Sequence, residues 1–454
     1  MEVMLENKKV NVNSLLMKLL ILMMLLFGLH IVPGIVSNGI KAVFVAVVFL
    51  GVISGALKLK FSPFNTLIYI YCGLLLVSLL TGGYFGFSTI LSTLQFIIFT
   101  VVIVNFNKEN VESGLMLYFK YIKPLVYFSI GYALVLKTFG SLMMQNGKRI
   151  SYLFSPVIHQ KVYGMAGQQF GYSGIYTNSN IFAFFCLVVL IILLNKQNKT
   201  NPAGKAFGCI WLMIGMWLAD SRAVSVCAIL VFMFAMLSKI RRKLSAKSFT
   251  ALVVLLGMAT VFLLFLSWRT ILSYLGGVDL AGRANYWITM FQSIKEHPVF
   301  GIGFANSSKY LLGDLSIGFT VGSHNSYLNI LCENGILGFG IFVLMNLYVG
   351  LTLCKNFYKT KNIPLINIAA VIFLVFIPYA MVENAYMIVE GRSYLWLLAC
   401  LCIVNWTFEN KPEIRPNPVV QYCCGLNNDE KYNNETSKHS DADLQCSSLC
   451  KTQH

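Results

Sequence analysis

The sequence predicts an all-α, polytopic integral membrane protein with about twelve transmembrane helices and a long extracytoplasmic loop. Of the 454 residues, 57% are hydrophobic and 12% are charged, and the mean hydropathy is +0.69. Soluble domains carry roughly 25% charged residues, so this composition excludes a water-soluble protein. The net charge is +17, and residues 1–408 hold 30 of the 35 Lys and Arg but only 11 of the 18 Asp and Glu. Because the positive charge belongs to the hydrophobic part, a basic tail that binds nucleic acid is excluded.

Each span needs about 20 mostly apolar residues. The stretches that meet this requirement cover approximately residues 15–36, 39–57, 63–82, 87–106, 119–140, 174–194, 204–220, 222–238, 248–271, 326–352, 363–382 and 393–408. The first stretch is long and has no evident small-residue cleavage site, so we interpret it as an anchor and not as a removed signal peptide. Residues 1–408 are therefore predicted to form one polytopic membrane domain.

Lys and Arg in the short loops predict the orientation of the spans. With a cytoplasmic N-terminus, every short inside loop is basic, through Lys58, Lys60, Lys108, Lys196, Lys199, Lys205, Lys239, Arg241, Arg242, Lys243, Lys247, Lys355, Lys359 and Lys361. The short loops on the other side, 37–38, 83–86 and the turn at Ser221, carry almost no charge. This pattern places two long loops, about 141–173 and 272–325, outside. It leaves both termini in the cytoplasm, with a polar and disordered tail over 409–454.

The outer loops nevertheless contain basic residues, which the orientation rule disfavours on that side. They are Lys148, Arg149 and Lys161 in the first loop and Arg283, Lys295 and Lys309 in the second, with Arg222 at a neighbouring helix end. No Asp or Glu occurs between Glu112 and Asp220. Carboxylates would repel phosphate groups, so an anionic ligand accounts for both observations. Ordinary surface charge is the competing explanation for the lysines.

The end of the second outer loop combines several distinctive features. Residues 283–295 are amphipathic at helical spacing, with Trp287, Phe291 and Ile294 on one side, which predicts a short helix at the membrane surface. His324-Asn325 follows where the chain re-enters the membrane. Gly335 and Gly338 then permit close helix packing.

These residues resemble a known family. His324-Asn325, nine residues, Gly335, two residues and Gly338 match the His-Asn-x9-Gly-x-x-Gly pattern of the O-antigen ligase/polymerase superfamily. Three other segments are similar to that family. The first contains Gly282-Arg283, Trp287, His297-Pro298 and Gly301-Ile302-Gly303. The second is Ser221-Arg222, and the third is the segment 174–180, with Gly174, Asn178 and Asn180. The resemblance covers about residues 15–408 and does not separate polymerases from ligases.

The resemblance implies glycan transfer on the outer face of a bacterial cytoplasmic (inner) membrane. The donor would be a glycan on undecaprenyl diphosphate, held at the lipid bilayer, and an acceptor hydroxyl would attack the anomeric carbon. In a polymerase the acceptor is another lipid-linked repeat unit, whereas in a ligase it is lipid A-core. A flippase and a chain-length regulator of the same pathway would be expected partners.

Residue chemistry supports this reading independently. Arginine stays protonated and chelates phosphate oxygens, so Arg283 and Arg222 are candidates to stabilise the diphosphate leaving group. Histidine titrates near neutrality, so we assign His324 to remove the acceptor proton. Asn325 would orient the imidazole or a sugar hydroxyl. No Asp-x-Asp motif lies in an outer loop, so we predict transfer without a metal or other cofactor.

Other candidates for substrate binding have equally simple structural explanations. They are Lys148, Arg149, Lys161, Asn178, Asn180 and Trp287. Asn178 and Asn180 could equally cap a helix, and Trp287 could belong to the aromatic belt at the interface. Arg222 could be a snorkelling anchor. Glu383 and Arg392 border the last outer loop and could form an ion pair.

Three functions remain open at this point. A polymerase of O-antigen or capsular/exopolysaccharide repeat units is favoured, and an O-antigen ligase would use the same site on a different acceptor. A secondary transporter or flippase for an anionic solute is the third. The middles of the spans contain almost no acidic residues, which disfavours a proton or cation pump. No convincing repeat relates the two halves, although transporters often have one.

Overall fold

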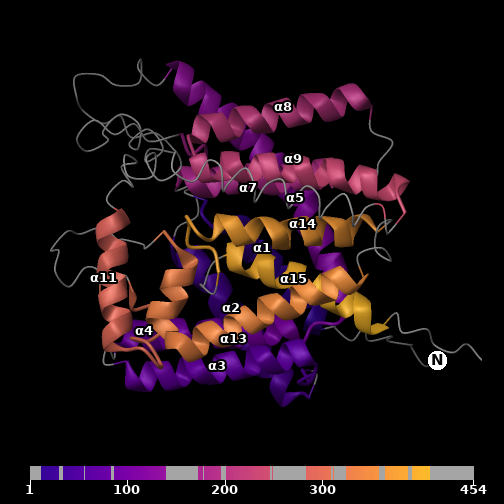
Figure 1. The fold of residues 1–454 in the computed structure, drawn as a ribbon. Coiled ribbons are helices and arrows are strands. Elements are labelled where there is room, and N and C mark those ends of the chain that lie inside the picture. Colours follow the sequence, from indigo (N-terminus) through magenta and orange to yellow (C-terminus); the bar gives the residue numbers. More distant parts are fainter. Residues whose placement is uncertain are drawn as a thin grey trace, which may run out of the picture. The chain divides into compact units, whose positions relative to one another are not determined.

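All regular elements of the described residues are α-helices in the computed structural model (Figure 1). The structure describes residues 12–29, 34–55, 57–82, 86–139, 172–176, 178–195, 201–245, 248, 283–307, 310, 324–356, 363–386 and 391–409. The helices are α1 (Val12–Leu26), α2 (Gly34–Ile53), α3 (Pro63–Thr81), α4 (Phe87–Val104), α5 (Lys108–Phe139), α7 (Ser179–Asn195), α8 (Pro202–Ala219), α9 (Arg222–Lys243), α11 (Arg283–Glu296), α13 (Ser326–Asn356), α14 (Pro364–Tyr379) and α15 (Gly391–Glu409).

Helices occupy the predicted spans wherever the two can be compared. Among the described residues, five helices are long and apolar enough to cross a membrane, namely α3, α4, α8, α9 and α13. Four shorter apolar helices lie in α1, α2, α7 and α14. The predicted span 248–271 and nearly all of the predicted tail lie outside the described residues, so the number of spans stays a prediction.

The end of α1 and the beginning of α5 differ most from the predicted boundaries. The helix α1 ends at Leu26, because Gly28 adopts a left-handed backbone (φ 73°) and Leu29 pairs with Tyr176 in an isolated β-bridge. The helix α5 begins at Lys108, earlier than its apolar stretch, and the side chain of Asn107 accepts a hydrogen bond from the Asn110 N–H at 2.9 Å. Hydrophobicity located the apolar part of α5 but not its polar, capped beginning.

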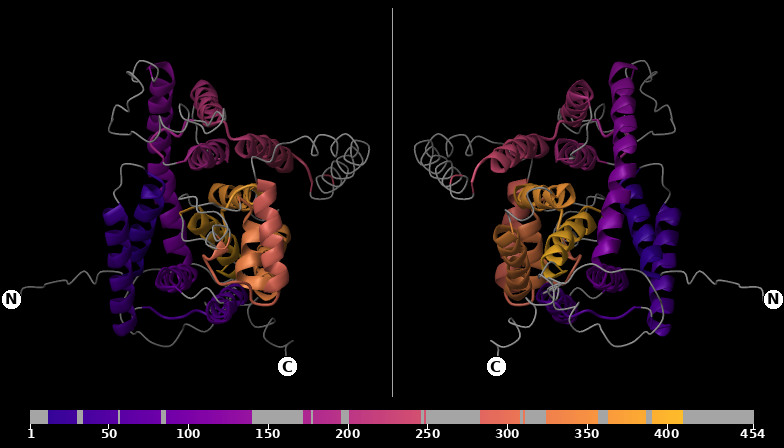
Figure 2. Two further views of the ribbon diagram at one scale, coloured as in Figure 1. Left: turned by 90° about the vertical axis from the view of Figure 1, so that its left-hand side faces the viewer. Right: turned by 90° about the vertical axis from the view of Figure 1, so that its right-hand side faces the viewer.

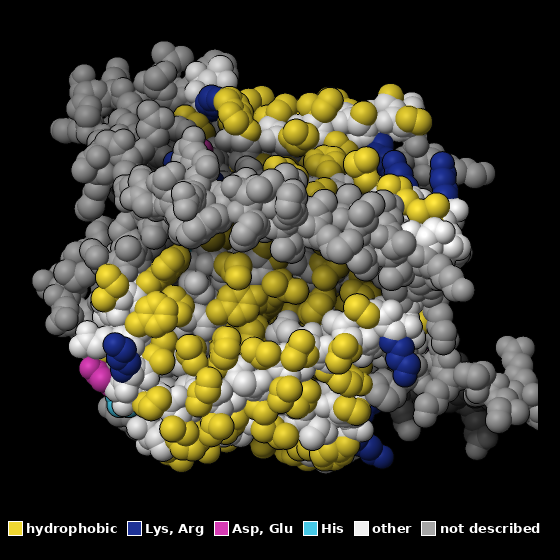
Figure 3. Space-filling model, in the orientation of Figure 1, with side chains coloured by type: hydrophobic (Ala, Val, Ile, Leu, Met, Phe, Trp, Pro, Cys, Tyr) yellow, Lys and Arg dark blue, Asp and Glu magenta, His cyan; other side chains and the backbone are white. Residues whose placement is uncertain are grey.

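Basic side chains collect at one end of the long helices, which we call the basic end. Lys205 Nζ, at the start of α8, donates to the Leu194 carbonyl at the end of α7 (3.1 Å). Arg241 Nη2, near the end of α9, donates to Asn367 Oδ1 near the start of α14 (2.9 Å). On the face shown in Figure 3, hydrophobic side chains cover the helix sides, and Lys and Arg gather mainly toward the right-hand side. This grouping agrees with the predicted inside loops, although the side of the membrane that it faces stays a prediction.

The opposite end of the helices holds His324, and we call it the His324 end. The Tyr172 N–H donates to the Leu218 carbonyl at 2.8 Å, which joins the segment before α7 to the end of α8. The Ser326 N–H donates to the Ala380 carbonyl at 2.8 Å, which joins the start of α13 to the end of α14. The residues that precede α7, α9 and α13 therefore lie at one end of the helices.

The helix α7 is buried over most of its length. Every residue from Ile181 to Ile192 is buried, against α5, α8, α9 and α14. A helix that is apolar all round is stable only inside a larger assembly of helices. This central position fixes the polar residues Asn178 and Asn180 at the His324 end.

Two pieces of chain run crosswise at the His324 end. Figure 1 shows α11 and the first part of α13 (326–334, before a break at Gly335) along the left-hand side, across the direction of α3, α9 and α14. The helix α11 lies in front when that side faces the viewer in Figure 2. The short helix predicted over residues 283–295 is therefore present as α11. Its protein-facing side centres on Met290 and Ser293, while Phe291, on the side predicted to lie at the membrane surface, is 51% exposed.

Candidate active site

The helix α13 is broken at Gly335, which divides it into a first segment (326–334) and a second segment (336–356). Gly335 has φ 63° and ψ −170°, a backbone conformation outside the helical region. A β-carbon at this position would overlap the backbone carbonyl of Val299. The glycine predicted to allow close helix packing is therefore needed for something different, namely a sharp turn of the helix against a neighbouring loop.

Residues 298–307 form that loop, and they pair with the backbone on both sides of the break. The Ile302 and Gly303 N–H groups donate to the carbonyls of Cys332 (3.0 Å) and Glu333 (2.9 Å). The Ile336 N–H donates to the Pro298 carbonyl at 2.8 Å. Interrupting a helix leaves polar backbone groups without partners, and this loop supplies the partners.

His324 and Asn325 lead directly into the first segment of α13. Asn325 Oδ1 accepts hydrogen bonds from the N–H groups of Tyr327 (3.0 Å) and Leu328 (3.1 Å) and so caps the helix. These two bonds hold the oxygen at the helix N-terminus, and a role for Asn325 beside the imidazole or a sugar hydroxyl stays a prediction. His324 has φ 51°, a left-handed conformation that turns the chain just before the helix.

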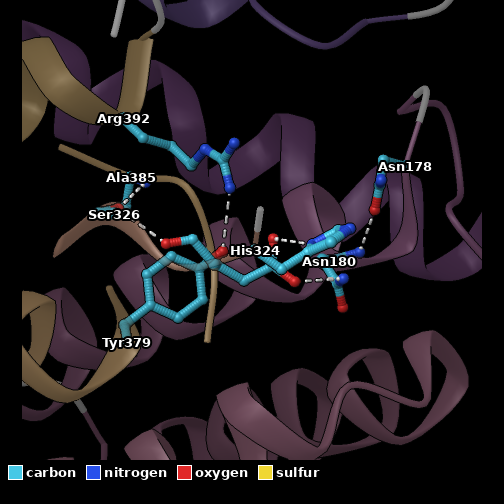
Figure 4. A network of polar contacts seen from close by, with 8 residues as sticks. Asn178, Asn180, His324, Ser326, Tyr379, Ala385 and Arg392 are labelled. Atoms are coloured by element: carbon cyan, nitrogen blue, oxygen red, sulfur yellow. Dashed lines mark hydrogen bonds and ion pairs between the residues drawn. The ribbon is translucent and has the colours of Figure 1, made fainter. Parts of the chain in front are cut away.

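A buried carboxylate lies beside the imidazole of His324. Glu383 Oε2 is 3.5 Å from His324 Nδ1, and the two side chains are 8% and 34% exposed, respectively. Asn180 Nδ2 donates to the other carboxylate oxygen, Glu383 Oε1, at 2.6 Å. Figure 4 shows Asn180, His324 and their neighbours as one polar network drawn from separate parts of the chain.

Ser326 fixes the turn that carries Glu383. Its hydroxyl donates to the Glu383 carbonyl at 2.8 Å and accepts from the Ala385 N–H at 2.7 Å. Beyond the turn, Arg392 Nη1 donates to the hydroxyl of Tyr379 at 3.2 Å. The start of α13, the end of α14 and the start of α15 are thus joined around the carboxylate (Figure 4).

This arrangement suits proton transfer by histidine. A carboxylate at Nδ1 favours the tautomer with a proton on that nitrogen, which leaves the lone pair of Nε2 available to a substrate. The same carboxylate stabilises the imidazolium that forms when Nε2 takes a proton. The contact of 3.5 Å is longer than a good hydrogen bond, and such contacts often shorten when substrate binds.

Comparison with protein families bears directly on this site. Residues 207–343 match a family model described as O-Antigen ligase. This match over about a third of the chain supports the resemblance to the O-antigen ligase/polymerase superfamily. No curated protein matches the sequence. This superfamily comprises enzymes of the glycosyl-transfer type, and together with the apolar helices it indicates a bacterial inner-membrane protein that uses lipid-linked glycans.

The family match includes half of the predicted site residues and part of the network. His324, Arg222, Arg283 and the break at Gly335 lie inside it, whereas Asn180 and Glu383 lie outside. Within the described residues, no group of three or more His, Cys, Asp or Glu side chains is placed to hold a metal ion. The family match therefore covers His324 and the two arginines, whereas the residues that complete the network around His324 come from outside the matched segment.

The structure places the predicted residues unequally. Arg222 is exposed at the first position of α9, at the His324 end. Arg283 begins α11 and Trp287 is partly exposed on it, although nothing is described of the Arg283 side chain. Asn178 Oδ1 accepts from the Asn180 N–H at 2.7 Å and so caps α7, and its part in substrate binding stays a prediction. The predicted Lys148, Arg149 and Lys161 lie outside the described residues.

Glu383 was not among the predicted site residues, and the sequence suggested only an ion pair with Arg392. The structure shows it as a buried acceptor for Asn180 and a neighbour of His324, and nearby Arg392 donates to Tyr379. One signal could have found it, because Glu383 is among the few acidic residues at the outer ends of the predicted spans. A charged residue retained near a span end is a functional candidate by default.

Proposed function

We propose that this protein polymerises undecaprenyl-diphosphate-linked oligosaccharide repeat units into O-antigen or capsular/exopolysaccharide on the outer face of the bacterial inner membrane. The observation that carries the proposal is the contact of His324 with the buried Glu383, at one end of the helices in a chain that resembles the O-antigen ligase/polymerase superfamily. In this contact Glu383 orients the imidazole through Nδ1. The imidazole is partly exposed, so a lipid-linked substrate can reach it as a base.

The reaction follows from these groups. A hydroxyl of the acceptor repeat unit attacks the anomeric carbon of the donor glycan, and His324 Nε2 takes the hydroxyl proton. The bond between the anomeric carbon and the diphosphate oxygen breaks, and undecaprenyl diphosphate leaves with its electron pair. Glu383 stabilises the imidazolium during this step.

Arg222 and Arg283 are proposed to hold the diphosphate. A diphosphate is already a good leaving group, so the protein has mainly to stabilise the charge that develops on it. Guanidinium groups bind phosphate oxygens in a two-pronged geometry. Both arginines begin helices, and a helix N-terminus favours a nearby anion.

An O-antigen ligase is the second candidate, because the matched family model is described by that activity. The same base and arginines would serve, with lipid A-core as the acceptor. Loss of a ligase leaves long chains on undecaprenyl diphosphate, whereas loss of a polymerase leaves single repeat units. Deletion of the gene, followed by separation of the lipid-linked glycans by size, therefore distinguishes the two activities.

A transporter or flippase is less well supported by the structure of α13. Broken helices in transporters often use their freed backbone groups to bind solute. Here the carbonyls of Cys332 and Glu333 and the Ile336 N–H are paired with the loop 298–307. Flux of an anionic solute through liposomes containing the purified protein, without glycan transfer, would favour the transporter.

Substitution of His324 and of Arg283 tests the proposed reaction. His324→Ala and Arg283→Ala should each lower transfer by about 3–4 kcal/mol of transition-state stabilisation, while the protein still accumulates in the membrane. Product length is measured on surface polysaccharide from the complemented deletion strain, and protein by immunoblot of the membrane fraction. Wild-type chain length in either variant would refute that residue's role.

A further inference from the structure

A second buried carboxylate, Glu333, lies at the far end of the helical segment that starts beside His324. The residue is 3% exposed. Glu333 Oε1 accepts from the N–H of Ser307 at 3.2 Å and from its hydroxyl at 2.6 Å. It therefore ties the first segment of α13 to the loop 298–307.

Backbone and neighbouring contacts fix this end of the segment further. The carbonyl of Glu333 accepts from the hydroxyl of Ser78 in α3 at 2.7 Å and from the Gly303 N–H at 2.9 Å. Asn334 Nδ2 donates to the hydroxyl of Tyr71, also in α3, at 2.9 Å. The helix turns away at the next residue, Gly335. Glu333 thus stands where the first segment of α13 is joined to its surroundings.

The segment between the two carboxylates is a short and stiff connection. Its other end is held by Ser326, which bonds the turn that carries Glu383. Along its side it packs against α11, where Cys332 Sγ lies 3.3 Å from Ser293 Oγ. A hydrogen-bonded helix transmits a displacement along its axis, because its backbone has little freedom to absorb one. The place of His324 relative to Glu383 therefore depends on where the Glu333 end is held.

We propose that Glu333 is a positioning residue that sets the place of His324 through the first segment of α13. The proposal rests on the function proposed above, and Glu333 itself has no contact with the reacting groups. A carboxylate suits this task because it only accepts hydrogen bonds, and its described partners are donors. Glutamine at this position would turn an NH2 group toward those donors.

Glu333→Gln is the direct test, on the full-length protein in proteoliposomes supplied with lipid-linked repeat units extracted from the deletion strain. We expect kcat to fall about 10- to 100-fold, because a displacement of about 1 Å can reduce a rate that much, while KM for the donor stays unchanged. Glu296→Gln is the matched control, since it makes the same change at an exposed carboxylate on α11. Wild-type kcat in Glu333→Gln would overturn the proposal.

A double variant separates positioning from a general structural role. If Glu333 acts only through His324, the variant His324→Ala/Glu333→Gln should keep the residual rate of His324→Ala alone. A further loss equal to that of Glu333→Gln would show that the two residues act independently, and the proposal would be wrong. If Glu333→Gln is not recovered folded, Ser307→Ala takes its place, with a smaller loss in the same direction expected.

A chemical readout keeps this proposal distinct from the proposed function. Diethyl pyrocarbonate modifies accessible imidazole nitrogens, and Glu383 lies against one nitrogen of His324. In Glu333→Gln, carbethoxylation of His324 followed by mass spectrometry should become faster and approach the rate in Glu383→Gln, while His297 serves as the internal reference. An unchanged rate at His324 overturns the positioning role. A faster rate in a protein that shows no glycan transfer supports positioning and rejects the transferase instead.

Discussion

Asparagine side chains are used differently at the two ends of the helices. At the basic end, Asn65 Nδ2 donates to the carbonyls of Lys60 (3.0 Å) and Val104 (2.9 Å). At the His324 end, Asn180 Nδ2 donates to the carboxylate of Glu383 instead. The first asparagine satisfies backbone groups at helix ends, and the second supports an ionisable side chain that faces a partly exposed imidazole.

This contrast separates structural from functional polar groups. Backbone carbonyls at helix termini need partners in any helical membrane protein, so their asparagines say little about activity. A buried carboxylate costs free energy and has no such obligation, so its place beside a histidine makes it a candidate for chemistry. Substitutions at the two ends should therefore alter different measured quantities.

Glu383→Gln should have the largest effect on activity at the His324 end. It removes the negative charge that stabilises the imidazolium but keeps the size of the side chain, so kcat should fall on the order of 10²-fold. Transfer by purified protein in proteoliposomes measures the rate. A rate close to that of wild type would show that the carboxylate only fills space, and the contrast between the two ends would lose its basis.

Asn180→Ala should have a smaller effect. Glu383 Oε1 would lose the donor at 2.6 Å, and weakening one charge-assisted hydrogen bond should reduce transfer about tenfold. Asn195→Ala is the control, because it removes an asparagine from the other end of the same helix, where Nδ2 donates to the Ile191 carbonyl at 2.9 Å. Equal losses in both variants would mean that α7 matters only as a packed helix.

Asn65→Ala should affect stability and leave the chemistry alone. Two carbonyls lose their donor, so the free energy of unfolding should fall by about 1–3 kcal/mol, with kcat per folded molecule unchanged. The midpoint of thermal unfolding in detergent measures the first quantity, and transfer normalised to folded protein measures the second. A specific loss of kcat would place function at the basic end as well.

Much of the helical architecture could be predicted from local sequence. Runs of apolar residues located the helices, and the spacing of His324, Asn325, Gly335 and Gly338 located the superfamily that the family match confirmed. Both signals are short in range. A hydrophobic run is recognised within a single helix, and a motif within a single stretch of chain. Neither signal depends on which distant segments come into contact.

The rest of the site depends on contacts between distant residues. Asn180 and Glu383 are 203 positions apart, and Ser326 and Glu383 are 57 positions apart. No periodicity within either segment reports that they meet. The break at Gly335 was hidden for a related reason, because a glycine chosen for helix packing and a glycine at positive φ look alike in sequence. Each of these features depends on tertiary contacts that the loop 298–307 and the turn at Glu383 make with distant parts of the chain.

His324 itself stands in the left-handed region of backbone space, as do Asp220 and Ala305 among the described non-glycine residues. For a residue with a β-carbon this conformation costs roughly 1–2 kcal/mol, whereas glycine adopts it without that cost. At position 324 stability and activity are therefore in conflict, because replacing His324 by glycine relieves the backbone strain but also removes the imidazole. Screens that select heat-resistant variants will reward glycine at this position, so any variant stabilised in that way must be assayed for transfer before its structure is read as that of a working enzyme.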